Sequence, residues 1–544
     1  MLKHSGLFII HTNKLFYIRG CIMREYNFDI AIIGGSLGGC AAALSACEYG
    51  KKVIMTEESP WIGGQLTSQA VPPDENQWIE NLCGTESYHR LRQNIRNYYK
   101  NHYPLTDEAR NIEYLNPGGG FVSPICHEPI VAHEALRQLL LPYISNGLLS
   151  IFTDTVPFSA RTDGSCIQSV TVKEKLSGDT CEITAEYFLD ATDCGDLLPL
   201  IGADYVTGSE SISQTGEPHA LAGAANPKDM QATTWCFAMD YVKDEDFTIS
   251  KPEDYDFWKN YRADFWVGSL LSFDTCDSRN CKPRRLTVFD EEDSGFLWNY
   301  RKILDKKLFR SGFYQSDITS VNWPMNDYWL GNLYDEPEKT VKKHMDGARS
   351  LSLSLLYWLQ TEAPTHDGKS GYPGFRLRGD VNGTKDGLAM RPYIRESRRI
   401  KAEYTILEQD ISAEWNAEKK AQRYPDSVGI GAYFIDLHPS TGGRNYIYVP
   451  TLPFTIPLGA MIERRFDNLI PSCKNIGTTH ITNGAYRLHP VEWNIGETAG
   501  WLAAYCMEHK MTPRSIYYSR TKCTDFQNSL IRRNVPLYWD ESRM

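Results

Sequence analysis

A glycine turn with an acidic residue beyond it is the pattern in this sequence that points most directly to chemistry. Gly34 permits a tight turn, Gly39 lets a helix pack closely on a strand, and Glu57 follows about 20 residues later. The N–H groups at the start of the helix can bind a pyrophosphate, and the carboxylate can accept hydrogen bonds from a ribose diol. The spacing therefore predicts a dinucleotide-binding site.

One position departs from the usual G-x-G-x-x-G motif. Ser36 stands where the second glycine normally lets the backbone approach the phosphates. Serine is small and its hydroxyl can donate a hydrogen bond to phosphate, so we interpret the change as tolerated. The alternative is a βαβ unit whose glycines serve only packing. The complete succession of strand, turn, helix and acid favours dinucleotide binding over that alternative.

The elements that must position this turn can be predicted on both sides of it. Residues 29–33 (DIAII) and 53–55 form β-rich apolar runs, and the small residues between them predict a helix. Residues 78–101 and 127–144 also predict helices, the second with an apolar face made of Ile130, Ala135, Leu136, Leu139 and Leu140. Strand patterns follow at 148–155, 166–175 and 181–192. The last ends in Ala191-Thr192, which is typical of a second pass of the chain beside a bound dinucleotide.

The composition limits the class of protein. The chain has 544 residues, of which 42% are hydrophobic and 23% charged, as in a soluble globular protein of two or more domains. A net charge of −11 argues against nucleic acid or an anionic membrane as a partner, and no apolar run reaches the roughly 20 residues of a membrane span. Scattered cysteines indicate reduced thiols and a cytoplasmic location. Cys276 and Cys281 lie in a polar loop without further ligands, so no metal site is predicted, and zinc there is the weaker alternative.

Changes in sequence character divide the chain into five parts. Residues 28–207 and 381–510 carry the glycine-rich motifs and are expected to form one nucleotide-binding domain, with 208–380 inserted between them. The insert is rich in tryptophan, and its rings either stack on a flat polar substrate or fill the insert's own core. Residues 511–544 are a C-terminal tail and 1–27 an N-terminal extension. The first convincing strand begins around Phe28, so we expect either a start assigned too early, with Met23 as the initiator, or a short ordered extension.

Together the motifs resemble those of the glutathione-reductase-like FAD/NAD(P)-binding superfamily, and within it the bacterial FAD-dependent oxidoreductase family. They are IIGGSLGGCAAALSA with Glu57, IGGQLTSQ, LDATDCGDLLPL, RESRRI, DLHPSTGG and AYRLHPVEWNIGETAG, and they span residues 28 to about 506. The resemblance implies FAD as cofactor and an α/β fold. This fold is a Rossmann FAD-binding domain with an inserted α+β, aromatic-rich substrate or cap domain. The superfamily hosts many chemistries, so the substrate is hardly specified.

The resemblance also implies where FAD is held. The pyrophosphate is expected at the glycine turn, the adenine beside Thr155-Val156, and the flavin near the N-terminus of a helix that begins around Asn494. The residues expected to bind the cofactor are Gly34, Ser36, Leu37, Gly38, Gly39, Glu57, Glu58, Gly63, Gly64, Gln65, Val156, Ala191, Thr192, Glu492, Asn494 and Gly496. For Gly63-Gly64, a plain surface turn is an equally weighted alternative.

A proton carrier is needed beside a flavin that accepts a hydride. Histidine is the usual carrier near neutral pH, and His489 or His438 is expected to act as acid/base, with Arg395 orienting a polar or anionic group. Each histidine taken alone is more often a structural hydrogen-bonding residue. Arg398 and Arg399 can equally pair with nearby acids.

The predicted function is that of an FAD-dependent oxidoreductase, an oxidase or dehydrogenase acting on a C–O or C–N bond of a small polar, possibly carbohydrate-like metabolite. One βαβ fingerprint is present, and no C-x-x-C or C-x4-C pair lies on the flavin side, so electrons are expected to leave to oxygen or an external acceptor. The alternatives are a flavin monooxygenase that uses NAD(P)H and a non-catalytic flavin-binding redox sensor. These motifs specify neither the substrate nor the oligomeric state.

Overall fold

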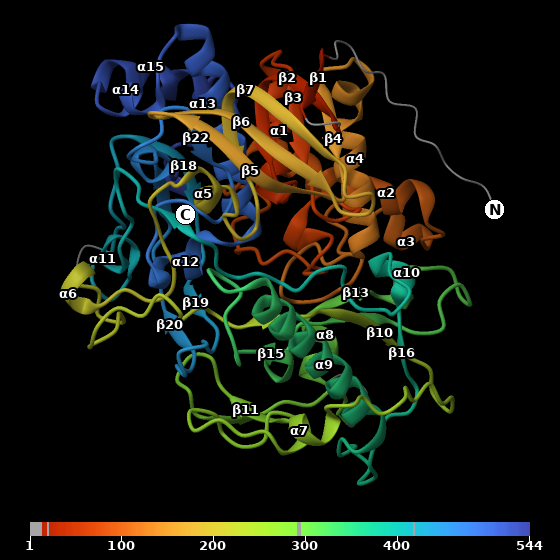
Figure 1. Ribbon diagram of the computed structural model, residues 1–544. Coiled ribbons are helices and arrows are strands. Elements are labelled where there is room, and N and C mark those ends of the chain that lie inside the picture. The colour runs from red at the N-terminus through yellow and green to blue at the C-terminus, as the bar shows by residue number, and fades with distance from the viewer. Residues whose placement is uncertain (1–13, 19–20, 291–294, 417–418, 544) are drawn as a thin grey trace.

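The computed structural model describes residues 14–18, 21–290, 295–416 and 419–543, and its largest sheet has eight strands (Figure 1). These are β1 (Lys14–Ile18), β2 (Cys21–Ile33), β3 (Val53–Thr56), β4 (Leu149–Phe152), β5 (Thr155–Asp163), β6 (Cys166–Glu174), β7 (Thr180–Asp190) and β22 (Leu469–Pro471). Strands β4, β3, β2, β7 and β22 are parallel neighbours in that order. β7 also continues into an antiparallel meander with β6 and β5, and β1 is antiparallel to the start of β2.

The parallel part of this sheet determines where the predicted site residues lie. β2 ends one residue before Gly34, β3 ends one residue before Glu57, and β7 ends one residue before Ala191. The register pairs Ile33 with Asp190, so these ends coincide. Because parallel strands end at the same edge of a sheet, three segments distant in sequence are brought together there.

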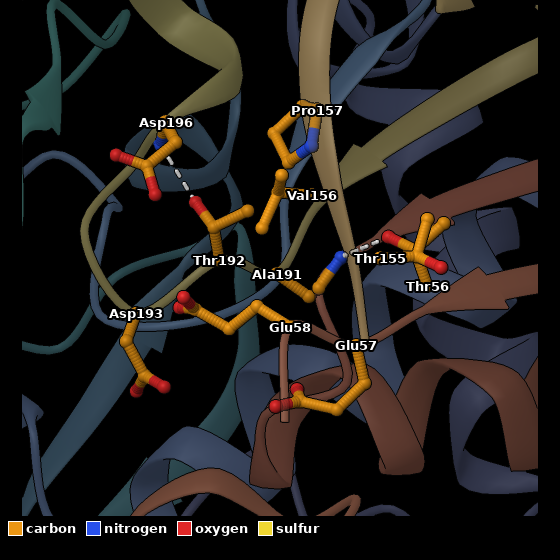
Figure 2. A pocket seen from close by; sticks show the side chains of 11 residues that line it. Thr56, Glu57, Glu58, Thr155, Val156, Pro157, Ala191, Thr192, Asp193 and Asp196 are labelled. Carbon is orange, nitrogen blue, oxygen red and sulfur yellow. Dashed lines mark hydrogen bonds between the residues drawn. The ribbon is translucent and has the colours of Figure 1, made fainter. Parts of the chain in front are cut away.

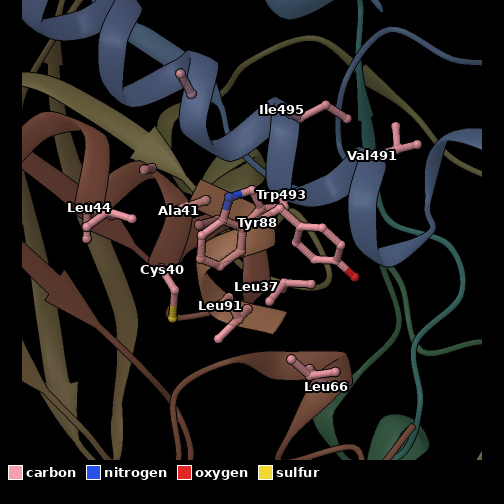
Figure 3. Close-up of a cluster of buried hydrophobic side chains, with 14 of the residues drawn as sticks. Leu37, Cys40, Ala41, Leu44, Leu66, Tyr88, Leu91, Val491, Trp493 and Ile495 are labelled. Atoms are coloured by element: carbon pink, nitrogen blue, oxygen red, sulfur yellow. The ribbon is translucent and has the colours of Figure 1, made fainter. Parts of the chain in front are cut away.

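Two helices of small residues pack against each other beside that edge. Helix α1 (Leu37–Glu48) follows the glycine turn, and α13 (His489–His509) comes more than 400 residues later. A Cβ atom on Gly496 would lie 2.0 Å from the carbonyl oxygen of Gly38, so the two backbones touch. Figure 3 shows side chains of both helices in one buried cluster, among them Leu37, Cys40, Ile495 and Trp493. Glycine is therefore required where the helices cross.

The other long helices are α2 (Glu86–His102), α4 (Pro129–Ser145), α9 (Glu338–Thr361) and α15 (Arg520–Ile531). The C-terminal part also contains the shorter α12 (His480–Tyr486) and α14 (Pro513–Tyr517). Short helices are α3 (Asp107–Arg110), α5 (Leu197–Ile201), α6 (Ile212–Thr215), α7 (Tyr255–Asn260), α8 (Phe296–Tyr300), α10 (Gly379–Asn382) and α11 (Glu408–Ile411).

A second hydrophobic cluster occupies the lower half of the molecule as drawn in Figure 1. It contains all six tryptophans between residues 235 and 329, which are Trp235, Trp258, Trp266, Trp298, Trp323 and Trp329. Helix α9 and a four-stranded sheet lie there, with strands β13 (Lys302–Leu304), β14 (Ile318–Val321), β10 (Phe237–Tyr241) and β16 (Phe375–Leu377). The tryptophan rings therefore fill a core and do not form a substrate-stacking surface.

Small two-stranded sheets are also present, and some of them carry polar residues of interest. They pair β9 (Thr233–Thr234) with β15 (Asp327–Tyr328), β19 (Ile435–Leu437) with β20 (Ile447–Val449), and β18 (Ser427–Gly431) with β21 (Phe454–Pro457). The others pair β8 (Tyr205–Val206) with β17 (Arg399–Ile400), and β11 (Asp274–Cys276) with β12 (Pro283–Arg285).

Several sequence-based expectations for the elements were wrong in detail. β2 begins at Cys21 and not near Phe28, because its first residues pair with β1; residues 1–13 and 19–20 of the N-terminal extension lie outside the described residues. Ile130 is exposed, and the buried face of α4 includes Val131 instead. Helix α13 begins at His489 and not around Asn494, because Pro490 occupies its first turn.

Candidate functional site

One pocket lies at the sheet edge where β2, β3 and β7 end. It is lined by Gly34, Thr56, Glu57, Glu58, Thr155, Val156, Pro157, Ala191, Thr192, Asp193 and Asp196. Six of these are residues that the sequence assigned to cofactor binding, namely Gly34, Glu57, Glu58, Val156, Ala191 and Thr192. Figure 2 shows their side chains converging from separate segments of the chain.

Gly34 and Ser36 shape the turn at the wall of this pocket. Gly34 has φ +102°, and a Cβ atom there would lie 2.4 Å from the backbone of Ala191, so only glycine fits. Ser36 is the N-cap of α1, and its Oγ accepts a hydrogen bond from the Gly39 N–H at 3.2 Å. The hydroxyl also interacts with the Cys473 side chain, so the serine caps the helix beside the predicted phosphate end of the turn.

Glu57 is buried at the end of β3. One carboxylate oxygen accepts a hydrogen bond from the Gly35 N–H at 3.1 Å, and the other accepts from the Ser59 N–H at 2.9 Å. Burial raises the pKa of Glu57 to about 7, against the opposing effects of the Ser59 hydrogen bonds and Arg391. Oε1 also accepts from the Ser59 hydroxyl at 2.7 Å, so the free lone pair that can accept from a ribose hydroxyl is on Oε2.

The start of α1 is held by Glu492 of α13. Glu492 Oε1 accepts a hydrogen bond from the Gly38 N–H at 3.0 Å and one from Cys473 Sγ at 3.2 Å, while Oε2 accepts from Gln65. A carboxylate at a helix N-terminus is stabilised by the free N–H groups and the helix dipole. Glu492 is thus brought to the predicted phosphate end of the turn.

Lys474 is a residue of this site that the sequence reasoning missed. Its side chain is fully buried, and Nζ lies 2.5 Å from Asp193 Oδ1 and 3.5 Å from Glu492 Oε2. Burial favours the neutral amine, but the two carboxylates outweigh it and hold the pKa of Lys474 well above its usual value. The sequence shows only a lysine directly after an apolar strand, in LIPSCKN, and does not indicate the distant Asp193 that pairs with its amine.

Five other predicted cofactor residues make packing or backbone contacts. Leu37 belongs to the buried cluster between α1 and α13. Gly63 donates its N–H to Gly35 O at 2.7 Å, and a Cβ atom on Gly64 would lie 3.0 Å from the Ser36 Cα, so this glycine pair lies against the turn and is not a surface turn. Asn494 accepts a hydrogen bond from Ile430 N of β18 and Gly496 contacts Gly38, and their place beside the flavin stays a prediction.

His438 and Arg395 are brought together by a residue that the sequence did not single out. Asp327 Oδ2 lies 2.6 Å from His438 Nδ1, and Asp327 Oδ1 lies 3.0 Å from an Arg395 amino group. The histidine side chain is 21% exposed, whereas the aspartate and the arginine are 0% exposed. Burial and the charge of Arg395 lower the pKa of His438, which favours a neutral imidazole.

Arg395 is held by several protein partners in this structure. Its guanidinium is enclosed and donates to Ala232 O and Thr234 Oγ1, both at 2.8 Å, and to Asn322 Oδ1 at 3.1 Å. These protein partners and Asp327 surround the guanidinium on several sides. In this structure it organises the protein around Asp327, and a role in orienting a substrate group stays a prediction.

His489 is less suited to proton exchange than His438. It is 0% exposed, and its Nδ1 accepts a hydrogen bond from the Asp74 N–H at 3.0 Å. Burial lowers the pKa of His489 to about 3 despite the nearby charge of Asp74. The neutral ring is enclosed at the start of α13, so we favour His438.

The remaining residues of the RESRRI segment form ion pairs, as the alternative interpretation held. Arg398 pairs with Asp196 and Asp335 at 2.9 and 3.1 Å, and Arg399 pairs with Glu396 and Glu210. These contacts fix the segment between the two regions.

A path of contacts joins the glycine turn to His438. Gln65, which binds Glu492, also donates to the Arg487 carbonyl at 3.1 Å. The Arg487 guanidinium donates to Asp436 O at 3.0 Å, and Asp436 Oδ2 lies 3.8 Å from His438 Nε2. A chain of polar contacts therefore runs from the nucleotide turn to Asp436, which lies next to the candidate proton carrier.

Cys276 and Cys281 lie closer to this network than the sequence indicated. Their spacing is C-x4-C, and Cys281 Sγ lies 3.4 Å from the carbonyl oxygen of Tyr446. The Tyr446 ring is in turn 5.5 Å from the His438 ring, centroid to centroid. The sequence placed both cysteines in a polar loop and did not indicate that Cys281 lies near Tyr446 and His438. Within the described residues, no group of three or more His, Cys, Asp or Glu side chains could hold a metal ion.

The FAD-dependent oxidoreductase family has a sequence model that matches residues 29–530, most of the chain. The protein therefore belongs to this family. It is an oxidoreductase, and its cofactor is FAD, as the sequence motifs predicted. Among the described residues, no helix combines the length and the apolar composition that crossing a membrane requires.

Individual relatives are distant. A stretch of 53 residues is 34% identical to the soluble pyridine nucleotide transhydrogenase of Hahella chejuensis. This stretch is 10% of this chain and 11% of that protein. A geranylgeranyl bacteriochlorophyll reductase-like protein of Thermoplasma acidophilum is similar over 94% of this chain and 84% of its own, with 10% identity and a TM-score of 0.30. L-Proline dehydrogenase from P. horikoshii is similar over 34% of this chain and 24% of its own, with 17% identity and a TM-score of 0.19. Similarities of this size do not specify a substrate.

Proposed function

We propose that the chain is an FAD-dependent oxidase or dehydrogenase that oxidises a C–O or C–N bond of a small polar, carbohydrate-like metabolite. The observation that carries the proposal is the chain of polar contacts from the glycine turn to Asp436, which lies 3.8 Å from Nε2 of the partly exposed His438. A pocket suited to a nucleotide and a neutral imidazole are the two parts that such a reaction needs.

The residues of the pocket fit the adenosine end of FAD. Glu57 and Glu58 would hold the ribose, Val156 and Thr192 would lie beside the adenine, and the α1 turn would bind the pyrophosphate. Gly34 leaves no room for a side chain at the turn, and Gln65 Oε1 is a buried acceptor without a protein partner among the described residues. When bound, FAD supplies a two-electron hydride acceptor.

The proposed chemistry assigns the proton to His438. Its Nε2 takes the proton of the substrate hydroxyl or amine, while the adjacent carbon gives up a hydride and becomes C=O or C=N. Bound FAD would supply the acceptor for this hydride, and oxygen or an external acceptor would take up the electrons. Because its pKa is lowered by burial and Arg395, His438 is neutral at physiological pH and ready to accept a proton.

Anaerobic titration of the holoprotein tests this function. A panel of polyols, sugars, amines and hydroxy acids is added to the oxidised protein, and bleaching of the flavin absorbance is followed. We expect one member to bleach the flavin, and we expect His438→Gln to slow bleaching by about 10²–10⁴-fold with the FAD content unchanged. Bleaching by NAD(P)H alone would indicate a monooxygenase. No bleaching, together with a changed oligomeric state after chemical reduction, would indicate a redox sensor.

A further inference from the structure

The arrangement around Asp327 defines which nitrogen of His438 can exchange a proton. We propose that Asp327 is a positioning residue that keeps the proton of neutral His438 on Nδ1 and leaves Nε2 as the reactive atom. The catalytic meaning of this inference rests on the function proposed above, but the position of the proton does not.

The geometry of the carboxylate carries the first step. Asp327 Oδ2 lies 2.6 Å from His438 Nδ1, a hydrogen-bond distance, and the aspartate has no exposed surface. An ionised carboxylate can only accept, so Nδ1 must be the donor. Burial tends to raise the pKa of Asp327, but Arg395 and His438 outweigh it, and the pKa stays below its usual value. The pair is thus a carboxylate and a neutral imidazole.

The second carboxylate oxygen fixes the orientation of Asp327. Oδ1 accepts a hydrogen bond from Thr234 and lies 3.0 Å from Arg395 Nη2. Thr234 and Asp327 face each other across the β9–β15 pair, so backbone pairing sets this contact. Two donors converge on Oδ1, which leaves Oδ2 for the histidine.

The other face of His438 is open to a ligand. The polar atom nearest to Nε2 among its charged neighbours is Asp436 Oδ2 at 3.8 Å, too long for a direct hydrogen bond. The charged and titratable groups facing the ring are Asp327, Asp436, Arg395 and Tyr446. Since the side chain is 21% exposed and Nδ1 is occupied, Nε2 is the nitrogen that can meet a substrate proton.

The same geometry predicts an unusual effect of Asp327→Asn. Arg395 and Thr234 both donate, so the amide oxygen of the variant must take the Oδ1 position, and the amide NH₂ must face His438 Nδ1. Nδ1 then becomes an acceptor, and the proton moves to Nε2. His438 Nε2 could then not accept a substrate proton, although asparagine has nearly the same shape as the aspartate it replaces.

Nitrogen NMR of holoprotein containing ¹⁵N-labelled histidine tests the proposal. His438→Gln assigns the signals, and His480, whose Nδ1 lies 3.0 Å from Glu396, is the internal control that must not change. We expect Nδ1 to carry the proton in the wild type and Nε2 to carry it in Asp327→Asn, with flavin bleaching slowed at least about tenfold. FAD content and a thermal melt report whether the variant is folded.

The possible results separate this inference from the proposed function. A proton on Nε2 in the wild type would overturn the inference, and that measurement needs no variant. An unchanged tautomer in a folded Asp327→Asn protein would also overturn it. The expected tautomers without any bleaching substrate would support the role of Asp327 and reject the proposed oxidation.

Discussion

Lys474 shows how a single buried side chain can hold the nucleotide turn together. Its ammonium lies against Asp193 and near Glu492, and Asp193 also accepts a hydrogen bond from Gln69 at 2.7 Å. Buried charges are costly unless they are paired, and removing one member leaves the others uncompensated. The cation therefore balances acidic groups next to a site that binds an anionic cofactor.

We expect Lys474→Met to destabilise the protein by about 3–5 kcal/mol, because Asp193 and Glu492 lose their buried cation. Urea denaturation followed by circular dichroism measures the change. The double variant Lys474→Met, Asp193→Asn is the control, and part of the stability should return in it. A loss below about 1 kcal/mol in the single variant would show that the ion pair is not structurally important.

Glu57→Gln is expected to weaken FAD binding by roughly 10–100-fold, because a charge-assisted hydrogen bond to the ribose is replaced by a weaker one. Fluorescence titration of apoprotein with FAD gives the dissociation constant. Glu245→Gln, an exposed position outside the pocket, is the matched control. Equal dissociation constants for the two variants would exclude Glu57 from the ribose site.

Glu128 gives a prediction about pH. Burial raises its pKa to about 7 against the hydrogen bonds of Tyr99 and Tyr103, so the folded state binds a proton that the unfolded state has already lost between about pH 4.5 and 7. Its contribution to stability is complete below pH 4.5 and is lost as the pH rises through 7. Relative to wild type, Glu128→Gln should gain up to about 3 kcal/mol between pH 4.5 and 8. Thermal melts at both pH values measure this difference, and a constant difference would contradict the raised pKa.

At the scale of elements, the contact between α1 and α13 determines the shape of the site. Gly496 lies against the backbone of Gly38, and Glu492 binds the first turn of α1 from the same helix. The helix that covers the nucleotide turn also supplies a carboxylate to it. Packing and site geometry therefore depend on one another here.

Gly496→Ala should separate these helices, because the added Cβ atom would lie 2.0 Å from a backbone oxygen that cannot move aside cheaply. We expect a loss of stability of about 1–3 kcal/mol and a lower FAD content after purification. Gly223→Ala, where no atom lies within 4 Å of the new Cβ, is the control and should behave as wild type. Melting temperature and the ratio of flavin to protein absorbance are the two measurements.

The sequence was informative where short-range pattern determines structure, and less so where distant segments meet. The strand, turn, helix and acid around Gly34 and Glu57 could be predicted because their spacing reflects local backbone geometry. Asp327 and Lys474 could not, since each acts only through partners far away in the chain. The start of α13 was misplaced because the small residues after Asn494 obscured the helix start at Pro490.

At the scale of the whole molecule, the chain has separate buried clusters. One surrounds α1 and α13, and another contains the tryptophans between residues 235 and 329. We propose that residues 208–380 form an inserted domain built on the tryptophan-containing cluster, with 28–207 and 381–510 forming the FAD-binding domain. None of the pocket-lining residues belongs to that cluster.

Leu355→Ala tests this division. Leu355 is fully buried in the tryptophan-containing cluster, and the cavity should cost about 2–5 kcal/mol. FAD content should nevertheless stay at the wild-type level at low temperature. Leu44→Ala, the same change within α1, should cost a similar amount and lower the FAD content as well. Equal loss of FAD from both variants would argue against two units.

The touching backbones of Gly38 and Gly496 also have a consequence during synthesis. The turn of α1 leaves the ribosome early, but its covering helix is made only near the end of translation. A nascent chain that lacks α13 has neither Glu492 nor the Gly496 contact to complete the turn. We therefore expect FAD to bind only after α13 has been synthesised, and chains truncated before α13 should be purified without flavin.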